Sequence, residues 1–370
     1  MKLIINLSNN IVGGGLQVAI SFIEECKNIS NNIYHIFLGE NASKQVNTNE
    51  FPSNFIFYQI PKLKIWRFQK FLKPLEKQIK PDCVFTIFGP SYWKPKKPHL
   101  MGYAYGHYIY FDSPYFRYTS LFYNVKIRIK GIFHLFMFKN NADYFATETE
   151  DAKNRLMKIM KTKQIYMVSN TCAEYYYNYN TYTNKLPERE NSEIRLITIT
   201  GYYKHKNLES IPLVIDELKK RNIGNIKFVL TINNNDFKKI IPDEYRRYIY
   251  NVGPIPSMEC PSLYKECDIL YLPTLLEIFS ASYPEAMAME MPILTSDLGF
   301  AHSICENAAL YFNPFSATDI ADKIAILIYN FGIRTKLIVE GKRQLSIFGT
   351  ARNRAKKYLK ICEKLALETK

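Results

Sequence analysis

The stretch Pro273–Asn307, PTLLEIFSASYPEAMAMEMPILTSDLGFAHSICEN, points most directly to the fold of this chain. The run Asp268–Leu272 before it predicts a buried strand, because it is short, largely apolar and bounded by a proline. A loop carrying Glu277 follows, and Pro284 stands where the first turn of a helix favours proline. Ile293–Thr295 then predicts the next strand. A strand, a loop, a helix and a strand in this order indicate a parallel α/β sheet.

The same alternation runs through the whole chain. In the first half we expect strands at Leu3–Leu7, Ile33–Leu38, Phe55–Tyr58, Cys83–Ile87, Tyr144–Thr147 and Ile165–Val168, with helices after Gly15, near Phe68–Ile79 and at Asp151–Met160. In the second half we expect strands at Arg195–Thr200 and Ile226–Thr231, and helices at Leu208–Lys220, Asp236–Tyr250, Glu259–Glu266 and Thr318–Tyr329. Two such series predict two doubly wound domains. Ligands of these sheets bind beyond the carboxyl ends of the strands, so we expect the site in a cleft between the domains.

A Tyr- and Asn-rich segment separates the two series and ends in the charged stretch Pro187–Glu193. We therefore predict an N-terminal domain over residues 1–170, a linker over 171–194 and a C-terminal domain over 195–345. The basic helix in residues 346–370 has no strand left to follow and is available to pack across both domains.

The chain is basic, because 49 Lys and Arg against 34 Asp and Glu give a formal net charge of +15. This charge predicts an anionic partner, which is a nucleic acid, an anionic membrane surface or a phosphorylated small molecule. A general compositional bias toward Lys explains the charge equally well. The segment Lys126–Lys139 (KIRIKGIFHLFMFK) mixes basic and apolar residues as interfacial membrane segments do, and an ordinary buried helix also fits it.

The seven cysteines are scattered and never spaced as CxxC, so we expect reduced thiols and no metal site. Residues 2–7 (KLIINL) are too short for the apolar core of a signal peptide. No apolar run approaches the roughly 18 residues of a membrane span. We expect a cytoplasmic protein that can rest peripherally on the inner face of the membrane.

Two loops carry groups suited to anions. Gly13, Gly14 and Gly15 lie between a strand and a helix, where glycines let the backbone approach a ligand and present amides at a helix N-terminus. A plain tight turn also explains them. The loop Gly201–Leu208 (GYYKHKNL) places Lys204 and Lys206 at the carboxyl end of a strand, where cations can neutralise a diphosphate. Solvated loop charges are the alternative.

Two carboxylates follow the strand predicted at Asp268–Leu272. Glu277 lies in the loop and Glu285, eight residues later, in the first turn of the next helix. Both can face one crevice, and paired carboxylates suit hydrogen bonding to vicinal sugar hydroxyls. The alternative is that Glu285 complements the helix dipole and Glu277 is exposed.

These residues resemble the donor-binding signature of glycosyltransferase family 4, which reads Pro-Ser-x-x-Glu-x-Phe-Gly and then Glu-Ala-Met-Ala-x-Gly-x-Pro-Val. Here the two parts are Pro273–Ser280 and Glu285–Ile293, with the same spacing of the glutamates. The loop GYYKHKNL resembles the Gly-Arg-x-x-x-Lys-Asn segment of the family, and Val168–Asn170 resembles its Ile-Pro-Asn before the linker. The resemblance implies the GT-B fold, with two facing Rossmann-like domains, and a retaining glycosyltransferase of the hexosyltransferase type that uses a nucleotide sugar.

The resemblance also implies roles for single residues. Glu285 would bind the donor ribose, Lys206 the diphosphate, and Glu277 with the backbone of Phe279 and Ser280 the transferred sugar. The N-terminal domain would face the acceptor and the C-terminal domain would bind the donor, with Gly13, Gly14 and Gly15 as the N-terminal glycine-rich loop. Gly102–Tyr108 (GYAYGHY) is similar to the His-bearing loop of the family, which makes His107 a candidate catalytic group beside Glu277.

Four positions depart from the pattern of the family. Ser280 and Glu290 stand where it has glycine, and Tyr202 stands where its diphosphate-binding arginine is usual. Lys204 is the candidate for the missing cation. Ser303 also occupies the position of a later glutamate.

The expected reaction moves a sugar from a nucleoside diphosphate sugar to an acceptor hydroxyl on a glycan or a lipid-linked acceptor, with no cofactor and no metal. Composition favours bacterial surface polysaccharide or lipopolysaccharide biosynthesis. One alternative is a sugar-nucleotide epimerase of the same fold, for which no acid/base residues stand out. Another is a basic nucleic-acid-binding protein, although the charges are dispersed and no nucleic-acid motif occurs. A nicotinamide dehydrogenase lacks its GxGxxG fingerprint here.

Overall fold

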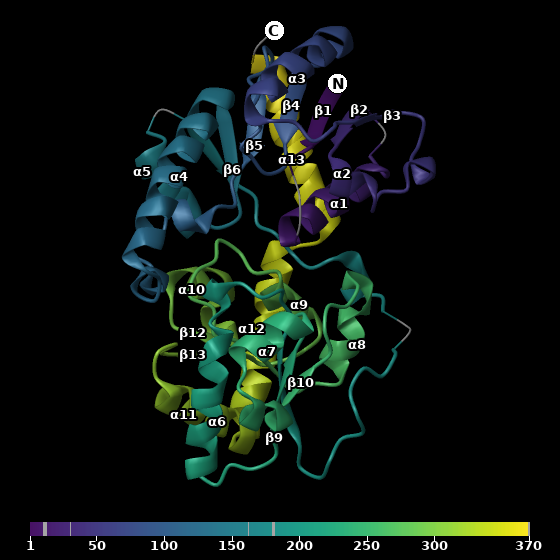
Figure 1. The fold of residues 1–370 in the computed structure, drawn as a ribbon. Helices are drawn as coiled ribbons and strands as arrows, with labels where there is room; N and C mark the ends of the chain where they lie inside the picture. The colour runs from purple at the N-terminus through teal and green to yellow at the C-terminus, as the bar shows by residue number, and fades with distance from the viewer. Residues whose placement is uncertain (10–12, 30, 162, 180–181, 369–370) are drawn as a thin grey trace. The chain divides into compact units, whose positions relative to one another are not determined.

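The computed structural model describes residues 1–9, 13–29, 31–161, 163–179 and 182–368. The chain forms two compact units (Figure 1). The first unit contains Met1–Asp112, Phe116–Asn170 and Thr350–Lys370, and the second contains Ser113–Tyr115 and Thr171–Gly349. The chain therefore passes from the first unit to the second and returns to the first for its last helix.

The first unit is built on a parallel sheet of seven strands in the order β3-β2-β1-β4-β5-β6-β7. The strands are β1 (Lys2–Leu7), β2 (Ile33–Leu38), β3 (Phe55–Gln59), β4 (Cys83–Thr86), β5 (His99–Gly102), β6 (Tyr144–Thr147) and β7 (Gln164–Met167). The helices are α1 (Gly14–Cys26), α2 (Glu40–Ser43), α3 (Ile65–Ile79), α4 (Leu121–Asn141), α5 (Glu150–Ile159) and α13 (Ala351–Glu368). The strand order reverses between β1 and β4, as in doubly wound sheets.

Successive side chains of β1 enter different layers of the core, because side chains alternate across a strand. Leu3 and Ile5 pack into the layer that α1 and α13 cover, and Ile4 packs into the layer of α3. In Figure 1 the yellow helix α13 runs beside α1 in this unit. Tyr358 of α13 stacks on Phe85 of β4 with ring centroids 4.8 Å apart. The final helix thus completes the core of the first unit.

The second unit contains a parallel sheet of six strands in the order β10-β9-β8-β11-β12-β13. The strands are β8 (Ile194–Thr198), β9 (Ile226–Leu230), β10 (Ile249–Asn251), β11 (Ile269–Leu272), β12 (Ile293–Ser296) and β13 (Ala309–Phe312). The helices are α6 (Ile211–Lys220), α7 (Asn234–Ile240), α8 (Cys260–Lys265), α9 (Ser282–Ala288), α10 (Gly299–Cys305), α11 (Ala317–Tyr329) and α12 (Phe331–Phe348). One core layer contains Ile197 and Leu270 and the other contains Leu196 and Tyr271, so helices cover both faces.

The single helix expected at Asp236–Tyr250 is divided in the structure. Helix α7 ends at Ile240, a 3-10 turn covers Asp243–Tyr248, and β10 follows. Pro242 lies at the break, where proline has no N–H with which to continue a helix. The two edge strands β10 and β13 were not predicted; each is three or four residues long and pairs with a single neighbour.

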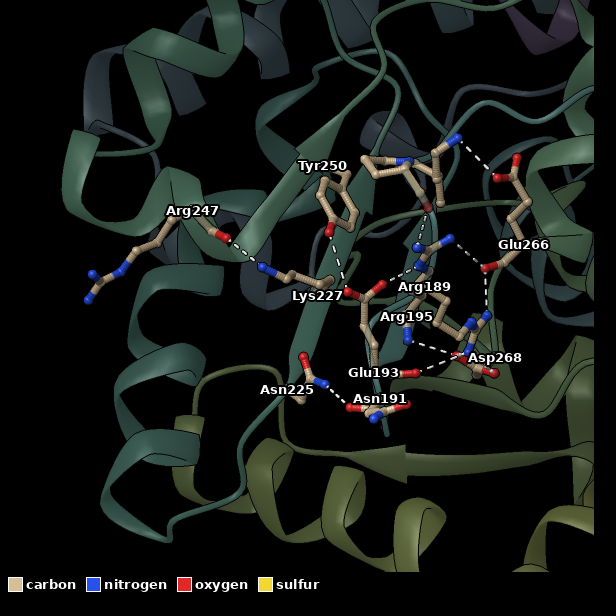
Figure 2. A network of polar contacts seen from close by, with 12 residues as sticks. Arg189, Asn191, Glu193, Arg195, Asn225, Lys227, Arg247, Tyr250, Glu266 and Asp268 are labelled. Carbon is tan, nitrogen blue, oxygen red and sulfur yellow. Dashed lines mark hydrogen bonds and ion pairs between the residues drawn. The ribbon is translucent and has the colours of Figure 1, made fainter.

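The segment over residues 171–194, expected as a linker, belongs to the second unit. Figure 2 shows its charged end against the sheet. Glu193 and Arg195 are buried and form an ion pair of 2.5 Å between Arg195 Nε and Glu193 Oε1. Tyr250 Oη donates to the other carboxylate oxygen at 3.3 Å, and Arg189 pairs with Asp268 at 2.7 Å. The charged stretch Pro187–Glu193 is thus anchored to the second unit by ion pairs.

Candidate functional site

The site of the second unit lies where the strand order reverses. Strands β8 and β11 are neighbours and parallel, while the chain continues from β8 toward β9 on one side and from β11 toward β12 on the other. The carboxyl ends of the strands at such a switch point are the usual ligand site of open α/β sheets. Lys206 follows β8 and Glu277 follows β11. Both residues therefore belong to the loops at this point.

Lys206 and Glu277 form an ion pair through Lys206 Nζ and Glu277 Oε1. Lys206 closes the 3-10 turn Lys204–Lys206, and Asn207 after it has a left-handed backbone with φ of 55°. Asparagine tolerates this conformation better than most residues. The loops are also joined through their backbones, because Leu275 N donates to His205 O at 2.7 Å.

Two further groups approach the carboxylate of Glu277. Thr274 Oγ1 donates to Glu277 Oε1 at 3.3 Å. His205 Nε2 lies 3.9 Å from the same oxygen, a distance at which a protonated imidazole forms an ion pair. Glu277 therefore lies among a hydroxyl, an imidazole and an ammonium group, all from the loops after β8 and β11. No role was predicted for His205.

Glu285 lies in the first turn of α9, as predicted, with Pro284 before it. Tyr264 Oη of α8 donates to Glu285 Oε2 at 3.0 Å. Burial raises the pKa of Glu285 from 4.5 to about 7, while hydrogen bonds from Tyr264 and Tyr176 and the positive charge of Lys206 lower it. Lys206 thus acts on Glu285 as well as on Glu277, and the three predicted donor residues form one electrostatic group.

Sequence reasoning did not find the residues that surround Glu285. Tyr264 and Tyr176 are buried, with ring centroids 6.0 Å apart in an edge-to-face arrangement. Burial and then the charge of Glu285 raise the pKa of the Cys260 thiol to about 12. For Cys172, burial is again the main cause of a pKa raised to about 11. Cys172 and Tyr176 come from the segment over 171–194, which has no hydrophobic period that could have placed them.

Phe279 and Ser280 lead directly into α9. Ser280 is buried, and its carbonyl accepts a hydrogen bond from Tyr283 N at 3.2 Å. Ser280 and Glu290, which stand where the family has glycine, differ in backbone conformation. Glu290 has a left-handed φ of 55°, a conformation that favours glycine, whereas Ser280 is not among the left-handed residues. Serine therefore fits position 280 without backbone strain, and glutamate at 290 is strained.

Lys204 and Tyr202 are the remaining residues of interest in the loops of the second unit. The side chain of Lys204 is exposed. Tyr202, at the position where the resemblance expects arginine, donates from Oη to Glu209 Oε1 at 2.6 Å. The phenol thus binds a carboxylate of the following turn, and a replacement cation at Lys204 stays a prediction.

Gly13, Gly14, Gly15 and His107 lie in the first unit. Gly13 has φ of 72° and precedes α1, and its carbonyl accepts from Leu16 N at 3.1 Å. Gly14 and Gly15 are the first residues of α1, a helix of 13 residues. The positive φ explains why glycine stands at position 13.

His107 lies in the 3-10 turn Gly106–Tyr108. Its ring meets the ring of Phe116 edge to face, with centroids 6.5 Å apart. Within residues 1–9, 13–29, 31–161, 163–179 and 182–368, no three His, Cys, Asp or Glu side chains are grouped so as to hold a metal ion. The catalytic role of His107 and the independence from metal stay predictions.

Comparisons with known proteins identify the fold. A glycosyltransferase from Rickettsia africae ESF-5 superimposes with a TM-score of 0.73 at 16% identity, covering 98% of both chains. Anabaena Alr3699/HepE, solved in complex with UDP and glucose, gives a TM-score of 0.69 at 12% identity, covering 98% of this chain and 100% of that one. WaaG, a glycosyltransferase involved in lipopolysaccharide biosynthesis, gives 0.72 at 13% identity over 97% and 99% of the chains.

The chain therefore has the GT-B fold of glycosyltransferases, which confirms the predicted fold class. Residues 194–330 match the family of glycosyl transferases group 1. This region begins with β8 and ends one residue after α11, so it contains Lys206, Glu277 and Glu285. No curated protein is significantly similar in sequence.

Proposed function

We propose that the protein is a retaining glycosyltransferase of the hexosyltransferase type, which moves a sugar from a nucleoside diphosphate sugar to an acceptor hydroxyl. The observation that carries this proposal is the grouping of Lys206, Glu277 and Glu285 at the switch point of the second sheet, inside the matched region. One ammonium group paired with one carboxylate and acting on a second suits a ligand that has both a diphosphate and several hydroxyls.

Each residue then has a distinct task. The carboxylate of Glu285 accepts hydrogen bonds from the ribose hydroxyls. Lys206 neutralises the diphosphate, and most of all the charge that develops as this group departs. Glu277 and the backbone of Phe279 and Ser280 hold the transferred sugar, so that the reacting carbon is oriented toward the acceptor.

The finer assignments rest on less direct support. Anabaena HepE has been solved with UDP-glucose, which supports UDP as the first nucleotide to test. The involvement of WaaG in lipopolysaccharide biosynthesis supports a bacterial surface polysaccharide or lipopolysaccharide pathway and a glycan or lipid-linked acceptor. All seven cysteines are buried thiols, which supports a reducing, cytoplasmic environment. We propose that the reaction needs neither a metal nor another cofactor.

Calorimetric titration of the full chain with UDP, GDP and ADP in EDTA tests the donor site. We expect at least one nucleotide to bind and to raise the melting temperature by mass action. Glu277→Gln should still bind that nucleotide but lose sugar transfer, because Glu277 is assigned to the sugar. Glu244→Gln, at an exposed carboxylate of the same unit, is the matched control.

The outcomes separate the proposal from its rivals. If none of the three nucleotides binds at millimolar concentration, the proposed donor site is wrong. Conversion of a nucleotide sugar to its epimer, without release of nucleotide, would identify an epimerase of this fold. Tight, salt-sensitive binding of DNA or RNA with no nucleotide affinity would favour the nucleic-acid alternative.

A further inference from the structure

Helix α4 exposes its large apolar side chains. A helix on the surface of a protein ordinarily turns such residues toward the core. Seven of them on this helix are exposed: Leu121 (80%), Phe122 (81%), Val125 (46%), Ile129 (64%), Ile132 (71%), Phe133 (44%) and Phe136 (62%). The helix spans 21 residues, so a third of it consists of exposed large apolar residues.

These seven residues, called here the α4 stripe, form one continuous face. At about 100° per residue their side chains fall within an arc of about 120°. The buried residues of the helix are Gly131, His134, Phe138 and Asn141, which lie on the opposite side. Gly131 fixes this orientation, because a Cβ there would be 2.8 Å from the ring of Tyr108. The α4 stripe therefore points away from the first unit.

The charges on α4 are all positive. The sequence of Leu121–Asn141, LFYNVKIRIKGIFHLFMFKNN, contains no Asp or Glu. Lys126 lies beside one edge of the α4 stripe and Arg128 beside the other, while Lys139 lies at the edge nearer to Arg128. All three side chains are exposed. Long basic side chains at the edges of an apolar face can extend their charged groups to an anionic surface while the apolar residues enter it.

We propose that α4 binds the first unit to the surface of an anionic lipid bilayer, with the α4 stripe in the headgroup region and Lys126, Arg128 and Lys139 on lipid phosphates. Apolar area supplies one part of such binding and charge the other. No described helix is long and apolar enough to cross a bilayer, so α4 lies along the surface. A second copy is a poorer occupant, since its α4 would bring the same positive charges against these. The proposal does not depend on sugar transfer.

Sedimentation of the full chain with vesicles tests the proposal. We expect binding to phosphatidylcholine vesicles that contain phosphatidylglycerol, weaker binding to phosphatidylcholine alone, and a decrease with added NaCl. The variant Ile129→Ser/Phe136→Ser should weaken binding at least tenfold, because it removes two exposed side chains from the α4 stripe. Lys126→Gln/Arg128→Gln should weaken binding to the anionic vesicles about 30-fold.

Matched variants remove the same chemistry elsewhere. Tyr329→Ser/Phe331→Ser changes two exposed aromatic residues of the second unit, at 72% and 73% exposure. Lys356→Gln/Lys357→Gln removes two exposed charges from α13. Both should bind vesicles as the unaltered protein does. All variants change exposed side chains, and their circular dichroism and melting temperature should show that they remain folded.

Three results would overturn the proposal. The first is equal binding to neutral and anionic vesicles. The second is unaltered vesicle binding by folded α4 variants. The third is a concentration-dependent dimer that the Ile129→Ser/Phe136→Ser change abolishes, which would make the α4 stripe a contact between copies. Failure of the proposed transferase activity would show instead in nucleotide binding, which the α4 variants should leave unchanged.

Discussion

The phenol of Tyr264 donates a hydrogen bond of 3.0 Å to the carboxylate of Glu285 and thereby favours its charged form. Tyr264→Phe should raise the pKa of Glu285 above about 7, because the ring remains while the donor is lost. A hydrogen bond to a charged group contributes about 1.5–3 kcal/mol. The affinity for UDP should rise as Glu285 ionises. In titrations from pH 6 to 9, this rise should therefore occur at a higher pH in Tyr264→Phe than in the unaltered protein.

Tyr358→Phe is the control for this change, because Tyr358 is a buried tyrosine of the first unit, stacked on Phe85. It should leave the pH profile of nucleotide binding unaltered. If Tyr264→Phe also leaves the profile where it was, the hydrogen bond does not govern the ionisation of Glu285.

Glu285→Gln should stabilise the protein above neutral pH. The pKa of Glu285 is about 7 in the folded state, against an ordinary value of 4.5. Between pH 4.5 and pH 7, the folded chain therefore keeps a proton on this carboxylate that the unfolded chain has lost. Stability therefore falls as pH rises from 4.5 to 7 and stays lower above it. The loss is about 3 kcal/mol. In urea unfolding, the free energy of unfolding should differ less between pH 5 and pH 8 in Glu285→Gln than in the control Glu244→Gln.

The same substitution should weaken nucleotide binding. A neutral amide cannot replace a carboxylate that accepts two ribose hydroxyls, so we expect the affinity at pH 8 to fall by about tenfold or more. Below pH 7 the difference should narrow, because Glu285 of the unaltered protein then becomes protonated. A folded Glu285→Gln protein that binds nucleotide normally at pH 8 would return Glu285 to the role of complementing the helix dipole.

Glu290→Gly should raise the free energy of unfolding by about 1 kcal/mol, since a left-handed residue costs about 1–2 kcal/mol when it is not glycine. The change also removes the ion pair between Glu290 and Lys342, 2.8 Å long and exposed, which contributes little. Glu290→Gln separates the two effects because it removes the charge and keeps the strain. Thermal unfolding should rank the glycine variant highest. Equal stability of both variants would mean that φ of 55° costs nothing here.

Arg195→Met should destabilise the protein by about 3–5 kcal/mol, because it leaves the buried carboxylate of Glu193 without its cation. Glu193→Leu/Arg195→Met removes both charges and should recover part of that loss. Arg343→Met, which breaks surface ion pairs with Glu306 and Glu340, should cost less than about 1 kcal/mol in urea unfolding. A loss at Arg195 as small as that at Arg343 would show that water reaches Glu193.

Local patterns in the sequence predict much of this fold. The strand before Glu277 and the helix after Pro284 follow from apolar runs and one proline, and Lys206 and Glu277 meet because their strands are neighbours. The partners of Glu285 do not follow in this way. Tyr264 and Tyr176 reach it from segments with no common period, through packing that depends on the whole unit. The charged stretch Pro187–Glu193 was expected only as part of a linker. Glu193 is nevertheless buried, and its partner Arg195 is known only from the structure.

The return of α13 to the first unit also determines the order in which the chain can be completed during synthesis. Residues 351–368 leave the ribosome after the whole of the second unit, which is continuous from Thr171 to Gly349 apart from Ser113–Tyr115. The second unit can therefore assemble while the first still lacks Tyr358 against Phe85. We therefore expect the first unit to mature after the second, whereas N-terminal domains usually mature first. Until α13 has been synthesised and has packed, the layer beside α1 presents an apolar surface that a chaperone can bind.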